Sequence, residues 1–565
     1  MCGILAIFSA DGQPIGTQSF EGSEHSLREL AYRQSGKQRH RGPDDTGILV
    51  IEEQGVALVH ERLAVIGVAT GHQPLQSRDG NIALITNGEI YNYLELTQKI
   101  VKRLPGYQPK SDCNVIIELY EEHGNKLLEH ITGMFSFVLY DRRRRQLLVA
   151  RDPFGIIPLY MGKDAAGNLW FASEMKCLVN VCDQLQVFPP GHMAMGTVKQ
   201  LPSPVRYYQP SWRQLIPTAE VNLKHLRQQL ELAVRSHLQC DVPFGALLSG
   251  GVDSSLIAAI AARIMRERDP SYKLRTFSVG MSGSPDFVHA RLVAKHIGSE
   301  HTEITFDVDD CLDGVRDLIY HLETYDVATV RCSLPMFYLA RHVKSTGIKM
   351  ILSGEGADEI FGGYLYFHKA PNYEEFHQEM ITRCEQLHVS DILRANKVTM
   401  SKGLELRVPF LDTALVDHVM GIRPQDKMAG ALNEFTGDRK WRMEKFVLRQ
   451  AFTGDYLPDA VLWRQKEQFS DGVGYALIDA LPNFAARHVS DAQLLEAKQR
   501  FPINPPKTKE AFYYRCIFEE QFPGESAANT VEKWAPRLDW GCPEDPSGRA
   551  QAAHDNGYGK CTIDY

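Results

Sequence analysis

Short apolar runs separated by turns fill the first part of the chain, from residue 3 to about 205. Runs such as GILAIFS, IALITN and FSFVLYD have the length of strands and are rich in branched and aromatic side chains, which suit a pleated sheet. Helical spacing interrupts them at only a few places, for example in SLRELAYRQS and NVIIELYEEHG. The pattern predicts an α+β domain built on antiparallel sheets over residues 2–205.

A proline-rich stretch at residues 200–221 shows neither the alternation of a strand nor the spacing of a helix, and we place the domain boundary there. Beyond it, apolar runs of strand length alternate with helical segments: VPFGALL, SSLIAAIAARIM, KLRTFSVG, DFVHARLVAKHIG, EHTEITF and KMILSG. This alternation predicts an α/β domain with a doubly wound parallel sheet over residues 206–525, mostly helical after about 365. Residues 526–565 are polar and glycine-rich, which predicts a flexible tail.

Length, charge and cysteine content narrow the classes of protein that remain. A chain of 565 residues exceeds the roughly 250 to 300 at which a single core stops growing. A formal net charge of −8 is mild and gives no reason to expect a nucleic acid or an anionic membrane as partner. No apolar run approaches the roughly 18 residues that span a bilayer. Eleven scattered cysteines without a C-x-x-C pair indicate free thiols in a reducing, cytoplasmic compartment.

A glycine-rich turn, LLSGGVDSS at residues 247–255, stands between a predicted strand and a predicted helix. In such a turn, backbone N–H groups approach a phosphate chain and the helix directs its positive end at the same anion. The loop lacks the lysine of G-x-x-x-x-G-K-[ST] and the spacing of G-x-G-x-x-G. Hydroxyls at Ser249, Ser254 and Ser255 suit phosphates, whereas the Asp253 carboxylate repels them unless Mg²⁺ lies between. The alternative is an ordinary turn followed by a helix cap.

A second loop, SGEGADEIFGG at residues 353–363, also follows a predicted strand and opens a predicted helix. The spacing of Glu355, Asp358 and Glu359 puts their carboxylates on one helical face. Three like charges there are costly unless a metal or another cation balances them. We therefore expect Asp253 and Asp358 to hold Mg²⁺ from opposite loops, which leaves Glu355 for proton transfer.

The chain begins MCGILAIF, with a cysteine directly after the initiator methionine. Methionine is commonly removed before small residues, and its removal would leave a thiol and a free α-amine together on Cys2. At neutral pH about a tenth of such amines are unprotonated and can accept the thiol proton, so no histidine base is required. The alternative is a frayed terminus with an inert thiol.

Four later stretches, RHRGPDDTG, HERLAVI, NGEIYN and SDCNVI, support the first interpretation of the terminal cysteine. In order and spacing they resemble the glutaminase domain of amidotransferases with an N-terminal cysteine nucleophile, a fold of stacked antiparallel sheets with flanking helices. The resemblance implies that Arg62 pairs with the carboxylate of glutamine and that Glu89 and Asp112 hold its α-ammonium group. It also implies an oxyanion hole formed by Asn87 and the backbone N–H of Gly88, donors that suit a tetrahedral intermediate.

The second half carries a resemblance of its own. SGGVDSS resembles the loop of the ATP-pyrophosphatase family, and ETYDVATVR, SGEGADEIFGGYLYFHKAP, GLELRVPFLD and WRQKEQFSDGVGY resemble stretches of glutamine-hydrolysing asparagine synthetases. The resemblance implies that Asp253 and Asp358 take Mg²⁺. It implies an ATP site made of Leu247, Ser249, Gly250, Gly251, Asp253, Ser254, Val279, Ser353 and Gly354.

Catalytic roles and a reaction are implied by the same resemblance. Glu355 is the base that deprotonates ammonia, Lys466 contacts pyrophosphate, and a loop with Thr329 and Arg331 holds the acyl-adenylate and phosphates. The reaction is ATP-dependent synthesis of asparagine from aspartate with glutamine as the nitrogen donor. It passes through a thioester on Cys2, internal transfer of ammonia and β-aspartyl-AMP, and it releases AMP and pyrophosphate. A homodimer is implied by the resemblance alone.

These residues also bear on three alternative functions. A relative of the same architecture that amidates another carboxylate, such as a sugar acid, stays open. A β-lactam-forming relative has no need of a glutaminase site. A catalytically inactive binding protein is disfavoured by four intact residues, namely Cys2, Asp253, Glu355 and Asp358.

Three remaining motifs carry no function. HERLA has Ala64 where the zinc motif H-E-x-x-H has its second histidine, so metal hydrolysis is excluded. DRRRR, between two predicted strands, is typical of a solvated hairpin turn and not of a nucleic-acid patch. GALNEFTGDRKWR at residues 430–442 resembles an insertion, and no role is assigned to it.

Overall fold

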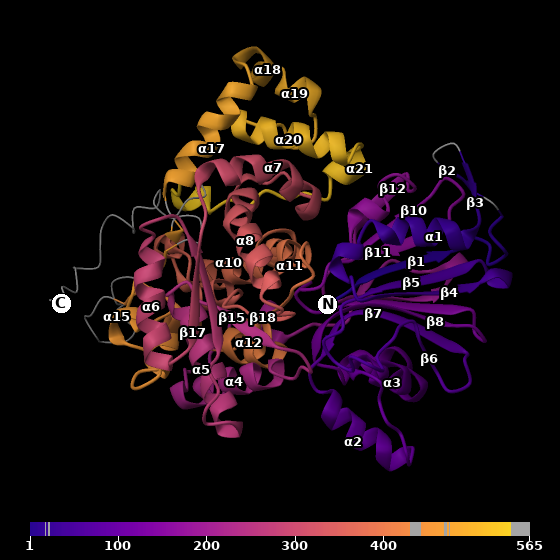
Figure 1. Cartoon of the computed structure of the whole chain (residues 1–565), viewed down its shortest axis with the longest axis horizontal. Coiled ribbons are helices and arrows are strands. Elements are labelled where there is room, and N and C mark those ends of the chain that lie inside the picture. Colours follow the sequence, from indigo (N-terminus) through magenta and orange to yellow (C-terminus); the bar gives the residue numbers. More distant parts are fainter. Residues whose placement is uncertain (17, 21–22, 430–441, 468–471, 474, 544–565) are drawn as a thin grey trace.

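Two six-stranded antiparallel sheets form the N-terminal half of the chain (Figure 1). The computed structural model describes residues 1–16, 18–20, 23–429, 442–467, 472–473 and 475–543. The first sheet has the order β12 (Gln184–Val187), β10 (Tyr160–Lys163), β11 (Leu169–Ala172), β1 (Gly3–Phe8), β5 (Val56–Arg62), β4 (Asp45–Ile51). The second has the order β14 (Val205–Arg206), β13 (His192–Thr197), β9 (Gln146–Arg151), β8 (Gly133–Asp141), β7 (Ile82–Ile90), β6 (Leu75–Gln76). A hairpin of β2 (Gln18–Phe20) and β3 (Ser23–His25) stands apart.

The two sheets pack face to face through alternate residues of their strands. On β1, Ile4 and Phe8 point into a core shared with Ile85 of β7, whereas Leu5 and Ile7 belong to the core on the opposite face. This period of two is expected of strands buried on both faces. Helix α1 (Leu27–Gly36) covers the first sheet, and α2 (Tyr93–Arg103) and α3 (Val115–His123) lie against the second (Figure 1). The predicted α+β fold is confirmed.

A five-stranded parallel sheet forms the centre of the C-terminal half. Its order is β17 (Glu300–Thr305), β16 (Arg275–Gly280), β15 (Phe244–Leu247), β18 (Met350–Leu352), β19 (Glu405–Arg407). The first four strands confirm the predicted doubly wound sheet. The fifth, β19, lies in the part predicted to be mostly helical and was not itself predicted, because three residues are too few to show a period. The strand order changes direction between β15 and β18, so the loops that follow these two strands face each other.

Helices pack on both faces of this sheet and continue to the end of the described chain (Figure 1). Those of the sheet region are α4 (Leu223–His237), α5 (Val252–Arg268), α6 (Pro285–Ile297), α7 (Val308–Leu322), α8 (Val327–Ser345), α9 (Ala357–Phe361), α10 (Tyr373–Gln386), α11 (Asp391–Met400), α12 (Thr413–Met420), α13 (Pro424–Lys427), α14 (Phe446–Ala451) and α15 (Asp459–Leu462). The C-terminal group comprises α17 (Tyr475–His488), α18 (Asp491–Leu495), α19 (Ala497–Arg500), α20 (Lys509–Gln521) and α21 (Glu525–Ala528).

The stretch predicted as a tail is in part packed. Ala527, Ala528 and Val531 are buried, and Trp534 packs against the ring of Tyr364. Apolar side chains spaced through this polar stretch explain the difference, since they give it a surface to bury. Residues 544–565 of the predicted tail and 430–441 of the predicted insertion lie outside the described residues.

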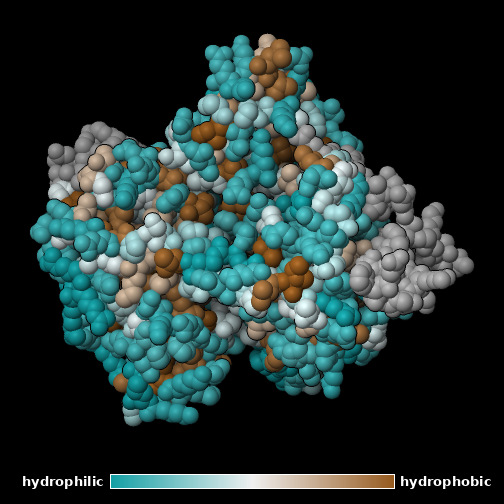
Figure 2. Space-filling model, turned by 180° about the vertical axis from the view of Figure 1, so that it is seen from behind, coloured by the Kyte–Doolittle hydropathy of each residue, from teal (hydrophilic) through white to brown (hydrophobic). Residues whose placement is uncertain are grey.

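Hydrophilic side chains cover most of the face opposite to that of Figure 1, with small scattered groups of hydrophobic ones (Figure 2). Within the described ranges, no helix combines the length and the apolar character needed to cross a bilayer. Burial of large apolar side chains is instead concentrated between the sheets and helices, and one buried cluster continues from the N-terminal half into the C-terminal half.

Candidate active sites

Cys2 lies buried just before β1, between Asn87 of β7 and Leu63, which follows β5. Its backbone N–H donates to Asn87 Oδ1 at 2.7 Å, and its Sγ accepts from the Leu63 N–H at 3.4 Å. Burial raises the pKa of the thiol, an effect that the nearby terminal ammonium and the Leu63 contact oppose. The thiol is therefore fixed in place and stays protonated unless a neighbouring base accepts its proton.

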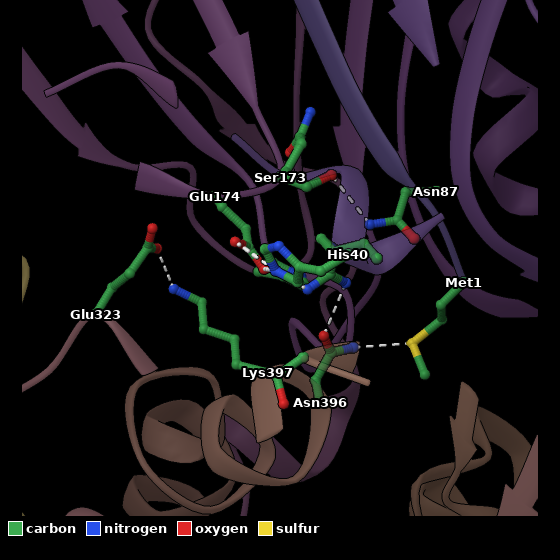
Figure 3. A network of polar contacts seen from close by, with 12 residues as sticks. Met1, His40, Asn87, Ser173, Glu174, Glu323, Asn396 and Lys397 are labelled. Atoms are coloured by element: carbon green, nitrogen blue, oxygen red, sulfur yellow. Dashed lines mark hydrogen bonds and ion pairs between the residues drawn. The ribbon is translucent and has the colours of Figure 1, made fainter. Parts of the chain in front are cut away.

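Asn87 and Gly88, the predicted oxyanion donors, follow each other on β7 beside Cys2. The Asn87 Nδ2 donates to Ser173 Oγ at 3.0 Å (Figure 3), so this amide is oriented from both ends. Gly88 has a φ of +144°, and a Cβ atom added to it would lie 2.1 Å from the carbonyl oxygen of Met134. Only glycine fits this position.

The acidic pair predicted to bind an ammonium group is buried next to these residues. Asp112 Oδ2 accepts the Ile90 N–H at 2.7 Å, while Glu89 Oε2 accepts no hydrogen bond within the described part of the chain. Burial first, and the nearby Glu405 and Asp112 next, raise the pKa of Glu89 well above its ordinary value. A bound ammonium group would relieve this repulsion, so the pair suits the α-ammonium of an amino acid.

Arg62, the predicted partner of the glutamine carboxylate, ends β5 close to this pair. Its guanidinium donates to the carbonyl oxygens of Gly67 at 2.7 Å and Val68 at 3.1 Å. These two contacts hold the side chain against the loop that follows β5. They leave other N–H groups of the five-donor fork for a carboxylate.

A second site is a cavity at the carboxyl ends of β15, β16 and β18, where a doubly wound sheet binds its ligands. We call it the nucleotide cavity. Most predicted residues line it, namely Leu247, Ser249, Gly251, Asp253, Ser254, Val279, Thr329, Ser353, Gly354, Glu355, Asp358 and Lys466. The sequence pattern missed others that line it, including Asp286, Tyr364, Asp391, Arg394, Lys445, Arg449, Arg464 and Trp534.

Some predicted residues are not among those that line this cavity, namely Gly250, Ser255 and Arg331. Gly250 turns the loop with a φ of +76°, and a Cβ there would meet the backbone of Ala290 at 2.6 Å. Arg331 points toward α20, where its Nη2 lies 2.6 Å and its Nε 2.9 Å from the carboxylate of Glu510. The resemblance alone placed Arg331 at the acyl-adenylate, and that role stays a prediction.

Opposite loops bring Asp253 and Asp358 to one ammonium group. Lys445 Nζ lies 2.5 Å from Asp253 and 2.6 Å from Asp358, and Lys466 Nζ lies 2.6 Å from the other oxygen of Asp358. Although burial acts to raise it, these two cations lower the pKa of Asp358 to about 2. Asp253 Oδ1 is buried and accepts no hydrogen bond in the described ranges. The sequence analysis did not predict Lys445, because this residue lies outside the glycine-rich motifs.

Glu355 lies in the same cavity, beside a cation from α11. Arg394 Nη2 is 3.1 Å from each oxygen of its carboxylate. Burial raises the pKa of Glu355, and the charge of Arg394 opposes that rise. Burial thus favours the protonated carboxyl and Arg394 favours the carboxylate, and such opposing influences are common for groups that exchange a proton.

Comparisons with known proteins match a family model to each half of the chain. A model of the asparagine synthase family matches residues 225–374 and 369–540, and a model of the glutamine amidotransferase domain matches residues 1–216. The probable glutamine-hydrolysing asparagine synthetase of Schizosaccharomyces pombe is 47% identical, over 98% of this chain and 99% of that protein. Asparagine synthetase B of Escherichia coli is 46% identical, over 99% of this chain and all of that protein. This chain belongs to the glutamine-hydrolysing asparagine synthetases.

In this asparagine synthetase, buried polar residues join the two halves between the sites (Figure 3). Arg41 donates to the Cys2 carbonyl oxygen at 2.8 Å and to Asn396 Oδ1 on α11 at 2.9 Å. Asn396 Nδ2 in turn contacts Met1 Sδ at 2.9 Å. Because α11 also carries Arg394, one helix touches both the cysteine site and the nucleotide cavity.

A second cluster at this interface is fully charged. Lys176 Nζ pairs with Glu174 and lies 3.1 Å from Glu323, which also pairs with Lys397. Lys397 Nζ donates to the Tyr160 hydroxyl at 2.7 Å. Glu174 and Lys176 belong to the N-terminal half, and the other two charges belong to the C-terminal half. Buried charges of this kind are tolerated only when they are paired, so the cluster fixes how the halves dock.

The geometry at Gly88 predicts a selective effect of one methyl group. Gly88→Ala should lower the melting temperature by several degrees and abolish glutamine hydrolysis, because the new Cβ collides with the Met134 carbonyl on β8. Thermal unfolding and release of glutamate from glutamine measure the two effects.

Gly106→Ala is the matched control, since Gly106 also has a positive φ, of +84°, but has nothing within 4 Å of an added Cβ. It should cost only about 1 kcal/mol of strain and retain glutamine hydrolysis. Equal loss of glutamine hydrolysis in both variants would contradict the collision.

Proposed function

We propose that this chain makes asparagine from aspartate and ATP, with glutamine as the nitrogen donor. The observation that carries the proposal is the contact between the two sites within one chain. Arg41 joins Cys2 to α11, and Arg394 joins α11 to Glu355. A buried path suits this chemistry, since ammonia released into bulk water is protonated and ammonium is not a nucleophile.

The first half-reaction is assigned to Cys2 after removal of Met1. The free α-amine of Cys2 accepts the thiol proton, and Sγ attacks the amide carbon of glutamine. Asn87 Nδ2 and the Gly88 N–H donate to the oxyanion, which requires the Asn87 amide to turn from Ser173. When the tetrahedral intermediate collapses, the α-ammonium group of Cys2 returns its proton to the leaving nitrogen, and ammonia departs. Water then hydrolyses the thioester to glutamate.

The glutamine itself is held as a zwitterion by charges of both signs. Arg62 pairs with its α-carboxylate, while Glu89 and Asp112 accept from its α-ammonium group. The Glu89 oxygen that accepts no hydrogen bond among the described residues and the raised pKa of its carboxyl support this assignment. A ligand without the ammonium group would leave the acidic pair uncompensated.

The second half-reaction is assigned to the nucleotide cavity. An oxygen of the aspartate β-carboxylate attacks the α-phosphorus of ATP and expels pyrophosphate, whose charge Lys466 and Lys445 offset. Ammonia then attacks the β-carbonyl carbon of β-aspartyl-AMP. Glu355 accepts the proton released from nitrogen, and AMP leaves.

Magnesium fits the two aspartates of this cavity. Mg²⁺ needs only one or two protein carboxylates when substrate phosphates supply its other ligands. Asp253 Oδ1, buried without a hydrogen bond among the described residues, would supply one such ligand and Asp358 the second. The ion would offset phosphate charge at the leaving group.

Division into domains at about residue 205 is also proposed. The amidotransferase and synthase models meet between residues 216 and 225, which supports a boundary near it. The ten described cysteines are free, which supports a cytoplasmic location. A homodimer is proposed on the family resemblance.

One incubation tests the reaction. With glutamine, aspartate, ATP and Mg²⁺, we expect asparagine, glutamate, AMP and pyrophosphate, quantified by chromatography. AMP that forms only with a different carboxylate would disprove aspartate as the acceptor. ADP in place of AMP would disprove adenylation.

Two substitutions should separate the half-reactions. Cys2→Ala removes the nucleophile, so synthesis from glutamine should be abolished while synthesis from added ammonium stays within about twofold. Asp253→Ala should abolish both, because the nucleotide cavity serves either source of ammonia. Equal loss from both sources in Cys2→Ala would make that residue structural.

The contact of Arg394 with Glu355 predicts a shift in pH dependence. Arg394→Gln removes a cation that lowers the pKa of Glu355, so that pKa should rise and the base form should be lost at higher pH. The rate of asparagine formation is measured against pH at a constant concentration of unprotonated ammonia. The acid limb of this pH profile should move to higher pH by about one unit.

Arg316→Gln serves as the control, because Arg316 is exposed and pairs with Glu520 far from the cavity. Its acid limb should coincide with that of the unmodified protein. An unchanged limb in Arg394→Gln would remove Glu355 from the role of base.

A further inference from the structure

Arg407 is a buried arginine of β19 whose side chain reaches out of the C-terminal half. Its Nη2 lies 3.2 Å from Glu89 Oε2, on β7 of the N-terminal half. Its Nε pairs with Glu405 at 2.7 Å, and its Nη1 donates to the carbonyl oxygens of His237 at 2.8 Å and Gln239 at 2.7 Å. Four contacts from three elements thus fix the guanidinium next to the predicted ammonium ligand.

The backbone of the same residue belongs to the other site. The Arg407 carbonyl oxygen accepts the N–H of Ser353 at 2.9 Å, and Ser353 lines the nucleotide cavity. Parallel pairing of β18 with β19 places Leu352 opposite Arg407, so the strand end that carries Ser353 is held in register with it. One residue therefore contacts both sites, by its backbone on one side and by its side chain on the other.

Charge explains why an arginine is needed here. Three buried carboxylates, Glu89, Asp112 and Glu405, gather beside Cys2. Glu405 also pairs with the ammonium of Met1, a partner that disappears when Met1 is removed. Arg407 is then the fixed cation among them, and it acts to lower the pKa of Glu89 against burial and its acidic neighbours. An ionised Glu89 is the form that accepts from an ammonium group.

We propose that Arg407 is a positioning residue of the glutamine site, contributed by the synthetase half, which holds the Glu89 carboxylate in place to accept from the α-ammonium of glutamine. This inference rests on the proposed function and extends it. The glutamine site is complete only when the two halves are docked. The isolated N-terminal half would retain Cys2 and Asn87 but would bind glutamine more weakly.

The test uses the full-length chain, with Met1 removal verified by mass spectrometry. Arg407→Lys keeps a positive charge but loses the planar fork that holds Glu89 and Glu405 together. The KM for glutamine should rise about tenfold with kcat within threefold, since a charge-assisted contact that orients a binding group is lost. Synthesis from added ammonium should stay within about twofold. Arg407→Gln, which also loses the charge, should raise the KM further.

Lys349→Met is the matched control. Lys349 lies just before β18 and pairs with Asp44 of the N-terminal half at 2.7 Å, so it too crosses between the halves. It does not contact Glu89, and its loss should leave the KM for glutamine unchanged. A KM in Arg407→Lys equal to that of Lys349→Met would overturn the inference.

Loss of ammonium-dependent synthesis in both Arg407 variants would also overturn it, because Arg407 would then serve the fold as a whole. The proposed function is judged separately on the unmodified protein. If that protein forms asparagine, glutamate and AMP from glutamine, aspartate and ATP, the function stands whichever way Arg407 behaves.

Discussion

Buried charges hold the two halves of this chain together, and each half supplies partners that the other lacks. Lys176 meets Glu323, Arg407 meets Glu89, and the terminal ammonium meets Glu405. Removing one member of such a pair leaves an uncompensated charge and costs roughly 3–5 kcal/mol, whereas an intact pair adds little net stability. The pairs therefore act on geometry more than on stability, since only one way of docking the halves satisfies all of them.

That docking decides where the chemistry takes place. Strand ends on both sides of the interface carry the reactive groups: Cys2 precedes β1, Glu89 lies near the end of β7, and Glu355 follows β18. Strands are stiff and their ends are fixed by hydrogen bonds to neighbours, so groups placed there keep their spacing. The short helix α11 spans the remaining gap. Two folds that share one continuous hydrophobic cluster thus bring their reactive groups to the same interface.

The pattern of apolar strands and glycine-rich turns in the sequence predicted those site residues that lie within a single loop. Asp253, Glu355 and Asp358 follow buried strands in glycine-rich turns, so sequence alone indicates their place at a sheet edge. Lys445 and Arg394 could not be found in this way, because their partners are set by tertiary packing across long stretches of chain. Arg331 is the reverse case: the family motif is present, but Glu510 holds the guanidinium against α20. Strand β19 was missed for its length alone.

The position of Met1 constrains the timing of maturation. Met1 is 1% exposed, and Glu405, which binds its ammonium group, lies 404 residues later in the chain. At about 5–20 residues per second, a ribosome needs roughly 20 to 80 seconds to reach that partner. An aminopeptidase has access to the methionine during this interval and loses it once the C-terminal half has docked. Synthesis speed, a property of the cell and not of the fold, would therefore set what fraction of molecules acquires a working glutaminase.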